Sequence, residues 1–204
     1  MGPALCYGPV PTDEGGMSEP DDDSLLAIYA AGDMAAAVPL ARRHLPRVLA
    51  VAQRMLGDAS EAEDVAQEAL MRLWRIAPDW EPGRAKVSTW LYRVTANLCT
   101  DRLRGRRPTE PLDAANDPAA PEPGVRERMQ DDQRRAALEN ALARLPERQR
   151  LAVILRHIEE LPNPEIAIAM GISVEAVESL TARGKLALGR ILAGRKEALG
   201  YVDE

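Results

Sequence analysis

Residues 60–76 constrain the fold of this chain more than any other stretch. They read S-E-A-E-D-V-A-Q-E-A-L-M-R-L-W-R-I. Apolar residues recur in them at the spacing of a helix with one buried face: Ala62, Val65, Ala66, Ala69, Leu73 and Ile76. Ser60 and Glu63 have the spacing of a capping box, so we expect this helix to begin at Ser60.

The opposite face of this expected helix is polar. Asp64, Gln67 and Glu68 lie at positions i, i+3 and i+4, which places two carboxylates and an amide in one patch. Most such patches are simply solvated faces of helices. The alternative is that this patch binds a partner. The composition of the next segment favours this alternative.

That next segment, residues 80–107, is basic and aromatic. Glu81, Pro82 and Gly83 predict a loop, and helical spacing resumes at Ser88. From residue 72 to residue 107 there are nine Arg or Lys and three Asp or Glu, in a chain of net charge −6. Basic residues interleaved with aromatic ones are typical of surfaces that bind phosphates and stack unpaired bases. Taken singly, Trp90 and Tyr92 are also compatible with ordinary packing residues.

Two separated motifs in this region resemble a known family. L-G-D-A-S-E-A-E-D-V-A-Q-E-A-L-M-R-L-W-R and S-T-W-L-Y-R-V-T-A-N-L-C-T-D-R-L-R are similar to region 2 of the sigma-70 family, in the compact form of the extracytoplasmic-function sigma factors. The resemblance extends over about residues 22 to 195.

The resemblance implies roles for individual residues. It implies that Asp64, Gln67 and Glu68 bind the clamp coiled coil of core RNA polymerase. The loop 81–87 and the helix after it match the elements that open and read the promoter −10 strand. The residues expected to contact that DNA are Arg84, Lys86, Trp90, Tyr92, Arg93, Asn97 and Arg104.

A second helical segment covers residues 131–199. Within it we expect a short helix from Pro164 to Met170, a tight turn at Gly171 and a longer helix from Val174 to Ala193. This order is that of a helix-turn-helix, whose second helix can enter a DNA major groove. With the preceding L-P-E-R-Q-R, it resembles sigma region 4, which reads the −35 element and contacts the polymerase flap.

The matching −35 positions in this chain are weakly basic. They are Arg156, Ser173, Glu175, Ala176, Ser179 and Arg183. Many relatives carry basic residues early in the recognition helix, where this chain has Glu178 and Leu180. This departure affects which −35 bases the recognition helix can read. The module as a whole is still expected to dock on DNA.

We therefore predict an all-α protein with two small helical domains, regions 2 and 4, joined by a flexible linker. The expected boundaries are a disordered tail over 1–21, region 2 over 22–107, the linker over 108–129 and region 4 over 130–200. The linker is rich in Pro and acidic residues, a composition that cannot bury a core. Met17 heads M-S-E-P-D-D-D, and we expect it to be the native start.

Residues 34–56 predict a further helix, with Leu40, Leu45, Leu49 and Met55 turned toward the core. Pro39 and Pro46 lie within it, so we expect a kink or a break at one of them. His44 is expected to be structural or exposed. Neither it nor the two cysteines has ligand spacing, so we expect no metal and no cofactor.

The sequence shows no catalytic motif and no apolar run near the roughly 18 residues of a spanning helix, so we expect a cytoplasmic protein that is not an enzyme and does not insert into membranes. The resemblance further implies control by an anti-sigma factor. Two other functions stay open from the residues alone. One is a stand-alone helix-turn-helix regulator, which would leave the motifs of residues 60–107 unused; the other is a helical adaptor protein that binds no DNA, which the basic stretch argues against.

Overall fold

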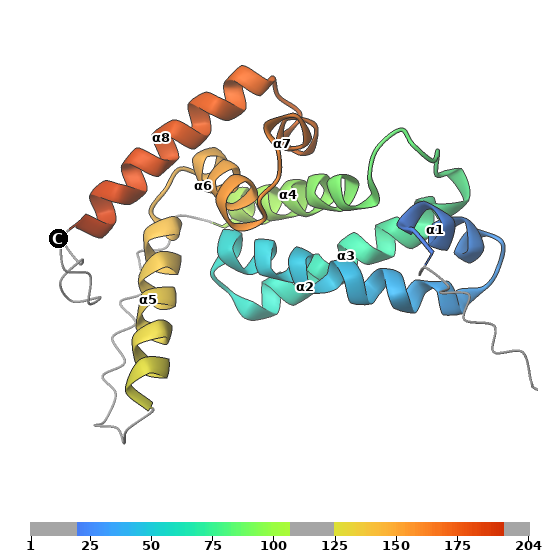
Figure 1. Cartoon of the computed structure of the whole chain (residues 1–204), viewed down its shortest axis with the longest axis horizontal. Helices are drawn as coiled ribbons and strands as arrows, with labels where there is room; N and C mark the ends of the chain where they lie inside the picture. Colours follow the sequence, from blue (N-terminus) through green and yellow to red (C-terminus); the bar gives the residue numbers. More distant parts are fainter. Residues whose placement is uncertain (1–19, 107–124, 194–204) are drawn as a thin grey trace, which may run out of the picture.

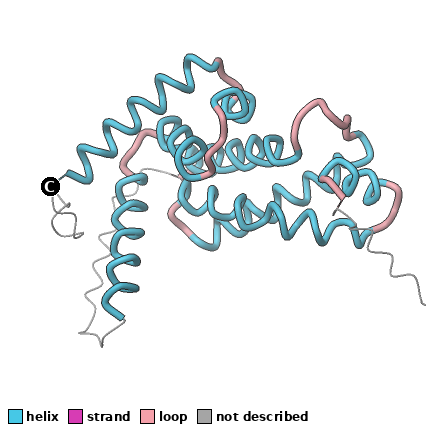
Figure 2. Tube along the Cα trace, viewed as in Figure 1, coloured by secondary structure: helices cyan, strands magenta, loops and turns pink. Residues whose placement is uncertain are grey.

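The computed structural model describes residues 20–106 and 125–193, with residues 125–132 described for their backbone alone. Within these ranges the chain forms helices and connecting turns without a strand (Figures 1 and 2). The first domain contains α1 (Asp22–Ala30), η1 (Met34–Ala36), α2 (Ala37–Leu56), α3 (Ala59–Ile76), η2 (Ala77–Asp79) and α4 (Val87–Gly105). The second contains α5 (Val125–Ala143), α6 (Glu147–Val153), the π-helical turn η3 (Ile154–Ile158), α7 (Asn163–Met170) and α8 (Val174–Ala193). The all-α prediction is confirmed.

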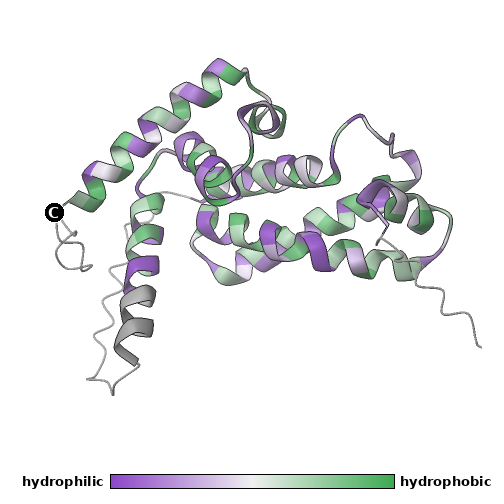
Figure 3. Cartoon of the chain, in the orientation of Figure 1, coloured by the Kyte–Doolittle hydropathy of each residue, from purple (hydrophilic) through white to green (hydrophobic). Residues whose placement is uncertain are grey.

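The first domain is a bundle in which α2, α3 and α4 pack side by side, while α1 closes one end against α2 and η2 (Figure 1). Hydrophobic and hydrophilic residues alternate along these helices at helical spacing (Figure 3). The inward faces meet in a core whose largest fully buried side chains include Leu26, Leu40, Leu73 and Leu91. Ala62, Val65, Ala66, Ala69 and Leu73 are buried as the periodicity predicts, and Ile76 is half-buried at the end of the stripe.

Helix α3 begins one residue before the predicted start. Its N-cap is Asp58, whose carboxylate accepts the N–H of Glu61 at 2.9 Å. The predicted capping box at Ser60 and Glu63 is therefore wrong. Gly57 takes a left-handed conformation (φ 69°) that ends α2, so Asp58 follows the turn directly and reaches the free N–H groups first.

Helix α2 continues through both prolines, so the predicted break does not occur. Pro39 lies in the first turn, where its missing N–H has no partner to lose, and Pro46 lies inside the helix. Leu40 and Met55 are buried as predicted, and Leu49 is half-buried, but Leu45 is 36% exposed. The inward position at this turn belongs to His44, whose Nε2 lies 2.7 Å from Asp22 Oδ2.

In the second domain, α7 and α8 form the predicted helix-turn-helix, with Gly171 left-handed (φ 63°) in the turn. Helix α5 begins at Val125, earlier than the predicted Asp131 and within the segment expected to be linker. The rest of that segment, 108–124, lies outside the described residues, as do most of the tail expected over 1–21 and the end of region 4 from residue 194.

The two domains touch along two contacts. Helix α7 packs on α4, and α5 and α6 pack on α2 (Figure 1). The buried apolar residues of both domains form one continuous cluster, which runs from Leu25 in α1 to Val177 in α8.

Helices α6 and α8 approach each other closely at Gly184. A Cβ at this position would lie 2.6 Å from Val153 Cγ2 and 3.2 Å from the carbonyl oxygen of Gln149. Gly189, on the same helix, has open space around it. The close packing of α8 on α6 thus requires glycine at position 184 and not at position 189.

Replacing Gly184 by Ala should lower the free energy of unfolding by about 1–3 kcal/mol, because the methyl group forces the helices apart. Gly189→Ala is the matched control. It should leave stability unchanged or raise it by roughly 0.5–1 kcal/mol through helix propensity. Urea denaturation followed by circular dichroism measures both, and equal effects would contradict the close approach.

Candidate functional site

The predicted polymerase-binding patch lies on the solvent face of α3. Asp64 and Gln67 are exposed, and Glu68 accepts a hydrogen bond from Arg72 Nε at 2.8 Å. This hydrogen bond holds the pKa of the Glu68 carboxyl below its ordinary value, so the group is charged at neutral pH. The structure brings the three predicted residues together on one face.

Met71 lies on the same face of α3, three residues after Glu68, and is 54% exposed. Sequence analysis did not single it out. A large apolar side chain beside two carboxylates is typical of a protein-binding surface, where apolar burial adds to charge pairing. The sequence signal that could have identified Met71 is that this large apolar residue lies outside the apolar stripe of α3.

The predicted −10 residues of α4 divide between two faces. Trp90, Arg93, Asn97 and Arg104 recur at intervals of three, four and seven residues, which places them in one line along the helix. Arg93, Asn97 and Arg104 are exposed and Trp90 is partly exposed. Tyr92 lies about 200° around the helix from Trp90 and therefore on a different face.

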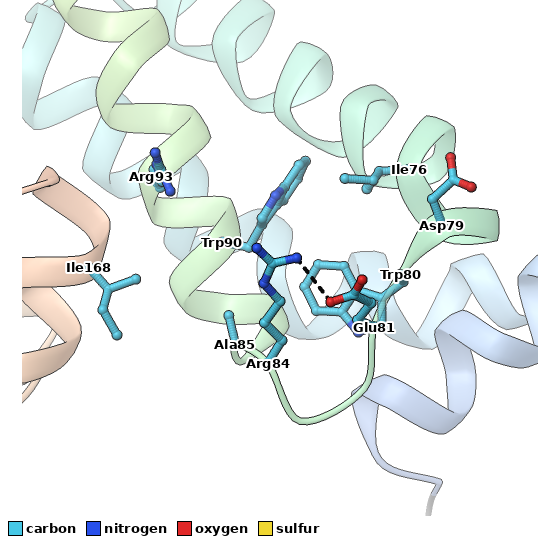
Figure 4. A pocket seen from close by; sticks show the side chains of 9 residues that line it. All are labelled: Ile76, Asp79, Trp80, Glu81, Arg84, Ala85, Trp90, Arg93 and Ile168. Carbon is cyan, nitrogen blue, oxygen red and sulfur yellow. Dashed lines mark hydrogen bonds and ion pairs between the residues drawn. The ribbon is translucent and has the colours of Figure 1, made fainter.

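A cavity of about 410 Å³ opens at the start of this line. Figure 4 shows Trp80, Trp90, Arg84 and Arg93 around it, with Ile168 of α7 facing them from the second domain. The Trp80 and Trp90 rings meet edge to face, with centroids 6.2 Å apart and planes at 86°. Glu81 Oε2 lies 2.9 Å from Arg84 Nη1. The carboxylates of Asp79 and Glu81 also line this cavity and balance the charges of Arg84 and Arg93. The two indoles provide flat faces on which an unpaired base can stack.

Asp23 of α1 holds the loop that forms one side of this cavity. Its Oδ1 accepts the indole N–H of Trp80 at 2.9 Å, and its Oδ2 accepts the backbone N–H of Gly83 at 3.3 Å. Gly83 is left-handed (φ 80°), which lets the loop turn its N–H toward Asp23. Sequence analysis missed this role, because Asp23 lies far from the loop in the chain.

Tyr92 is 2% exposed and covered by the second domain. Its hydroxyl donates to Glu159 Oε2 at 2.8 Å. Burial first, and then the bond to the Glu159 carboxylate, raise the pKa of the Tyr92 hydroxyl well above its ordinary value. Lys86, exposed at the start of α4, lies 2.6 Å from Glu165 Oε1.

Of the predicted −35 residues, Ser173, Glu175, Ala176 and Ser179 lie around the start of α8, Arg183 lies near its middle, and Arg156 lies outside it. Glu175, Ser179 and Arg183 are exposed at intervals of four residues. The Arg183 Nε donates to the carbonyl of Ser179 at 3.2 Å. Ala176 is half-buried, and its N–H donates to Ser173 Oγ at 3.3 Å. Ser173 thus contributes to the helix start.

Two further side chains near the helix-turn-helix are engaged. Arg156 lies on η3, and its Nη1 donates to the carbonyl of Leu161 at 3.0 Å. The Asn163 side-chain amide donates to Glu178 Oε1 at 3.4 Å, so Glu178 links α8 to the start of α7. Glu178 therefore has a structural contact.

The described residues contain no group of three His, Cys, Asp or Glu side chains placed to hold a metal ion. Within the same residues, none of the helices has the length and apolar character required to cross a membrane.

Comparison with known proteins identifies the family. Residues 40–109 match the family model for sigma-70 region 2, and residues 135–188 match that for sigma-70 region 4. The chain belongs to the sigma-70 family. It is 35% identical to the ECF RNA polymerase sigma factor SigE of Mycolicibacterium smegmatis, over 89% of this chain and 73% of that protein. It is 32% identical to SigM of Mycobacterium tuberculosis, over 94% of both chains. These relatives place it in the extracytoplasmic-function group.

Solved structures agree with this placement. The structure of CnrH in complex with the cytosolic domain of CnrY matches with a TM-score of 0.64 and 28% identity, covering 85% of this chain and 97% of the matched chain. RpoE of Bartonella quintana, solved with the anti-sigma factor NepR, shares the fold at a TM-score of 0.57 and 22% identity, over 73% of this chain and 91% of RpoE. As a sigma factor, the chain is a transcription initiation factor that directs core RNA polymerase to promoters. Because both regions are present, it is not a stand-alone helix-turn-helix regulator.

Asp23→Ala should loosen the loop beside the cavity, because Trp80 and Gly83 both lose their acceptor. Hydrogen exchange at the Gly83 amide should become faster by roughly tenfold, the loss of about one hydrogen bond. Asp79→Ala, which removes an exposed carboxylate from the same cavity, is the control and should leave that rate unchanged. An unaltered Gly83 rate in the Asp23 variant would contradict the role given to Asp23.

Proposed function

We propose that this sigma factor reads the promoter −10 strand with the line Trp90, Arg93, Asn97 and Arg104 and with the neighbouring cavity. The observation that carries the proposal is the position of this line, which starts at a cavity lined by two indoles, two guanidinium groups and two carboxylates. Guanidinium groups bind phosphates, and an indole can stack an unpaired base. Arg84 and Lys86 extend the basic surface on the loop side.

Tyr92 is also proposed to contact the −10 strand, but it lies on a different face of α4 from Trp90. Its hydroxyl lies on the face that α7 covers, beside Lys86 and Thr89. It can reach DNA after α7 has moved away from α4. Lys86, whose Nζ lies 2.6 Å from Glu165 Oε1 of α7, needs the same movement to be free of its partner. Arg93, Asn97 and Arg104 are exposed and need no such movement.

The polymerase contact is assigned to the solvent face of α3. Asp64 and Glu68 offer charges for basic residues of the clamp coiled coil, Gln67 offers a hydrogen-bonding amide, and exposed Met71 adds apolar area. An anti-sigma factor that covers this face would compete with core polymerase. The work of the protein is thus binding and positioning without catalysis, in the cytoplasm, where polymerase and promoters are found.

Region 4 is proposed to read the −35 element with the exposed side of α8, through Glu175, Ser179 and Arg183. Arg183 is the positively charged residue among these three. Arg156 lies on η3, which precedes α7 in the chain. Ser173 and Ala176 lie at the helix start, where backbone N–H groups can approach a phosphate. Because Glu178 binds Asn163, it helps to hold α8 on α7.

The polymerase contact can be tested by charge reversal. Asp64→Lys with Glu68→Lys should weaken assembly with core polymerase by roughly a hundredfold, because two interfacial charges become repulsive. The control pair, Asp79→Lys with Asp101→Lys, makes the same change in net charge at exposed positions off the α3 face. A pull-down with core enzyme measures assembly, and normal assembly of the first pair would refute the assignment.

The −10 assignment predicts a template-dependent defect. Trp90→Ala and Asn97→Ala should lower open-complex formation on duplex promoters more than on templates with a pre-melted −10 bubble, since the latter need no unstacking. Permanganate footprinting with holoenzyme measures strand opening. An equal loss on both templates, accompanied by a lower melting temperature, would show that Trp90 acts in packing.

The −35 assignment predicts a change in salt dependence. If Arg183 contacts a phosphate, Arg183→Ala should weaken holoenzyme binding to all −35 sequences alike and lower the salt slope by about one. If it reads a base edge, the loss should be about 1–3 kcal/mol at one promoter position. Affinity measured against salt over a panel of single −35 substitutions separates the two. Unchanged affinity and slope would mean that α8 does not face DNA in this way.

A further inference from the structure

The first turn of α8 carries an outward-facing carboxylate. Glu175 is the second residue of α8 and is exposed. Val177 and Gly184, which are buried, lie about 180–200° around the helix from it. Glu175 therefore faces away from the side on which α8 packs against the rest of the second domain. In a helix-turn-helix, the residues at the start of the second helix contact base edges.

The neighbouring polar side chains at this end of α8 are engaged within the protein. The Ser173 hydroxyl oxygen accepts the N–H of Ala176 at 3.3 Å and so caps the helix. Glu178 Oε1 accepts the side-chain amide of Asn163 at 3.4 Å. Glu178 is thus directed toward α7, whereas Glu175 faces outward.

The Glu175 carboxylate is charged and held in place. Hydrogen bonds from its own backbone N–H and from the Ser173 hydroxyl hold the pKa of the Glu175 carboxyl below its ordinary value. A charged carboxylate can only accept hydrogen bonds. Because DNA phosphates repel it, this group adds nothing to general affinity for DNA. Its contribution to DNA binding is discrimination between bases.

A group that only accepts hydrogen bonds distinguishes the four bases in the major groove. Cytosine presents an amino donor, its N4 group, whereas guanine and thymine present acceptors. Adenine presents its N6 amino donor beside the N7 acceptor, which repels the second carboxylate oxygen. The carboxylate therefore fits cytosine best, and the other bases place an acceptor against it.

Arg183 lies further along α8 and reaches a different part of the groove. It comes eight residues after Glu175, which is a rise of about 12 Å along the helix. The major groove is itself about 12 Å wide. When Glu175 reaches the bases, Arg183 therefore lies at the edge of the groove, beside the phosphates. Its Nε donates to the carbonyl of Ser179 at 3.2 Å, so the guanidinium lies along the helix.

We propose that Glu175 determines the specificity of the −35 readout by accepting a hydrogen bond from the N4 amino group of a cytosine, while Arg183 contacts a phosphate. The proposal rests on the −35 function proposed for α8. It goes beyond that function by naming the residue that selects and the base that is selected. Promoters of this sigma factor then carry a C·G pair beneath the first turn of α8.

The test is a selection by holoenzyme from a duplex DNA library randomised over the −35 and −10 regions, followed by sequencing of the bound DNA. The wild-type protein should enrich cytosine roughly tenfold over the other bases at one −35 position. E175Q should move that preference to adenine, because a glutamine side chain pairs with adenine N6 and N7. E175A should lose the preference at that position and keep the others.

Two matched variants separate base reading from a general effect of charge. E178Q removes one carboxylate from the same helix, at a position directed toward α7, and should keep the cytosine. R183A should recover less DNA in total and also keep the cytosine, because a phosphate contact carries no sequence information. Loss of the cytosine in either variant would overturn the proposal. An unchanged preference in both E175Q and E175A would overturn it as well.

Failure of this proposal and failure of the −35 function give different results. If the wild-type holoenzyme enriches no base in the −35 region, α8 does not read DNA, and the role of Glu175 is refuted with it. If E175Q and E175A enrich the same −35 bases as the wild-type protein, the −35 function stands and the role of Glu175 alone is refuted.

Discussion

The arrangement of both domains depends on hydrogen bonds to the backbone carbonyls at the C-terminus of α2. Arg150 of α6 donates to the carbonyl of Met55 at 2.6 Å, and Arg106, after α4, donates to the carbonyl of Leu56 at 2.9 Å. Helix C-termini leave such carbonyls without partners and favour positive charge. Arg150 also donates to the carbonyls of Ala143 and Leu145, so one guanidinium joins α2 to the turn between α5 and α6.

Arg150 is buried, and burial is the main reason why the pKa of its guanidinium lies below the ordinary value. Guanidinium groups remain protonated in proteins, so this position holds a charge whose partners are backbone carbonyls. Burying a guanidinium group is costly unless its N–H groups find acceptors, and the carbonyls of Met55, Ala143 and Leu145 provide them here. The Arg150 contact and the contact between α7 and α4 lie apart along the bundle, and together they fix the second domain on the first.

Sequence patterns predicted the individual helices and their faces well, because periodicity reports which side of a helix meets a core. The α3 stripe, the α3 patch and the helix-turn-helix all follow from it. The patterns could not show which surface lies against another domain. Tyr92 and Glu159 are far apart in the chain, and so are Asp23 and Trp80. The local errors have local causes, since Asp58 caps α3 in place of Ser60 and His44 takes the inward position beside Leu45.

The central claim is that the contacts between the two domains fix the second domain on the first in the free chain. Spin labels at Asp79→Cys and Lys185→Cys, in a chain with Cys6→Ser, allow the distance between α8 and the first domain to be measured by pulsed electron resonance. The account predicts one narrow distance distribution in the free chain. A broad distribution, or several separate distances, would contradict it.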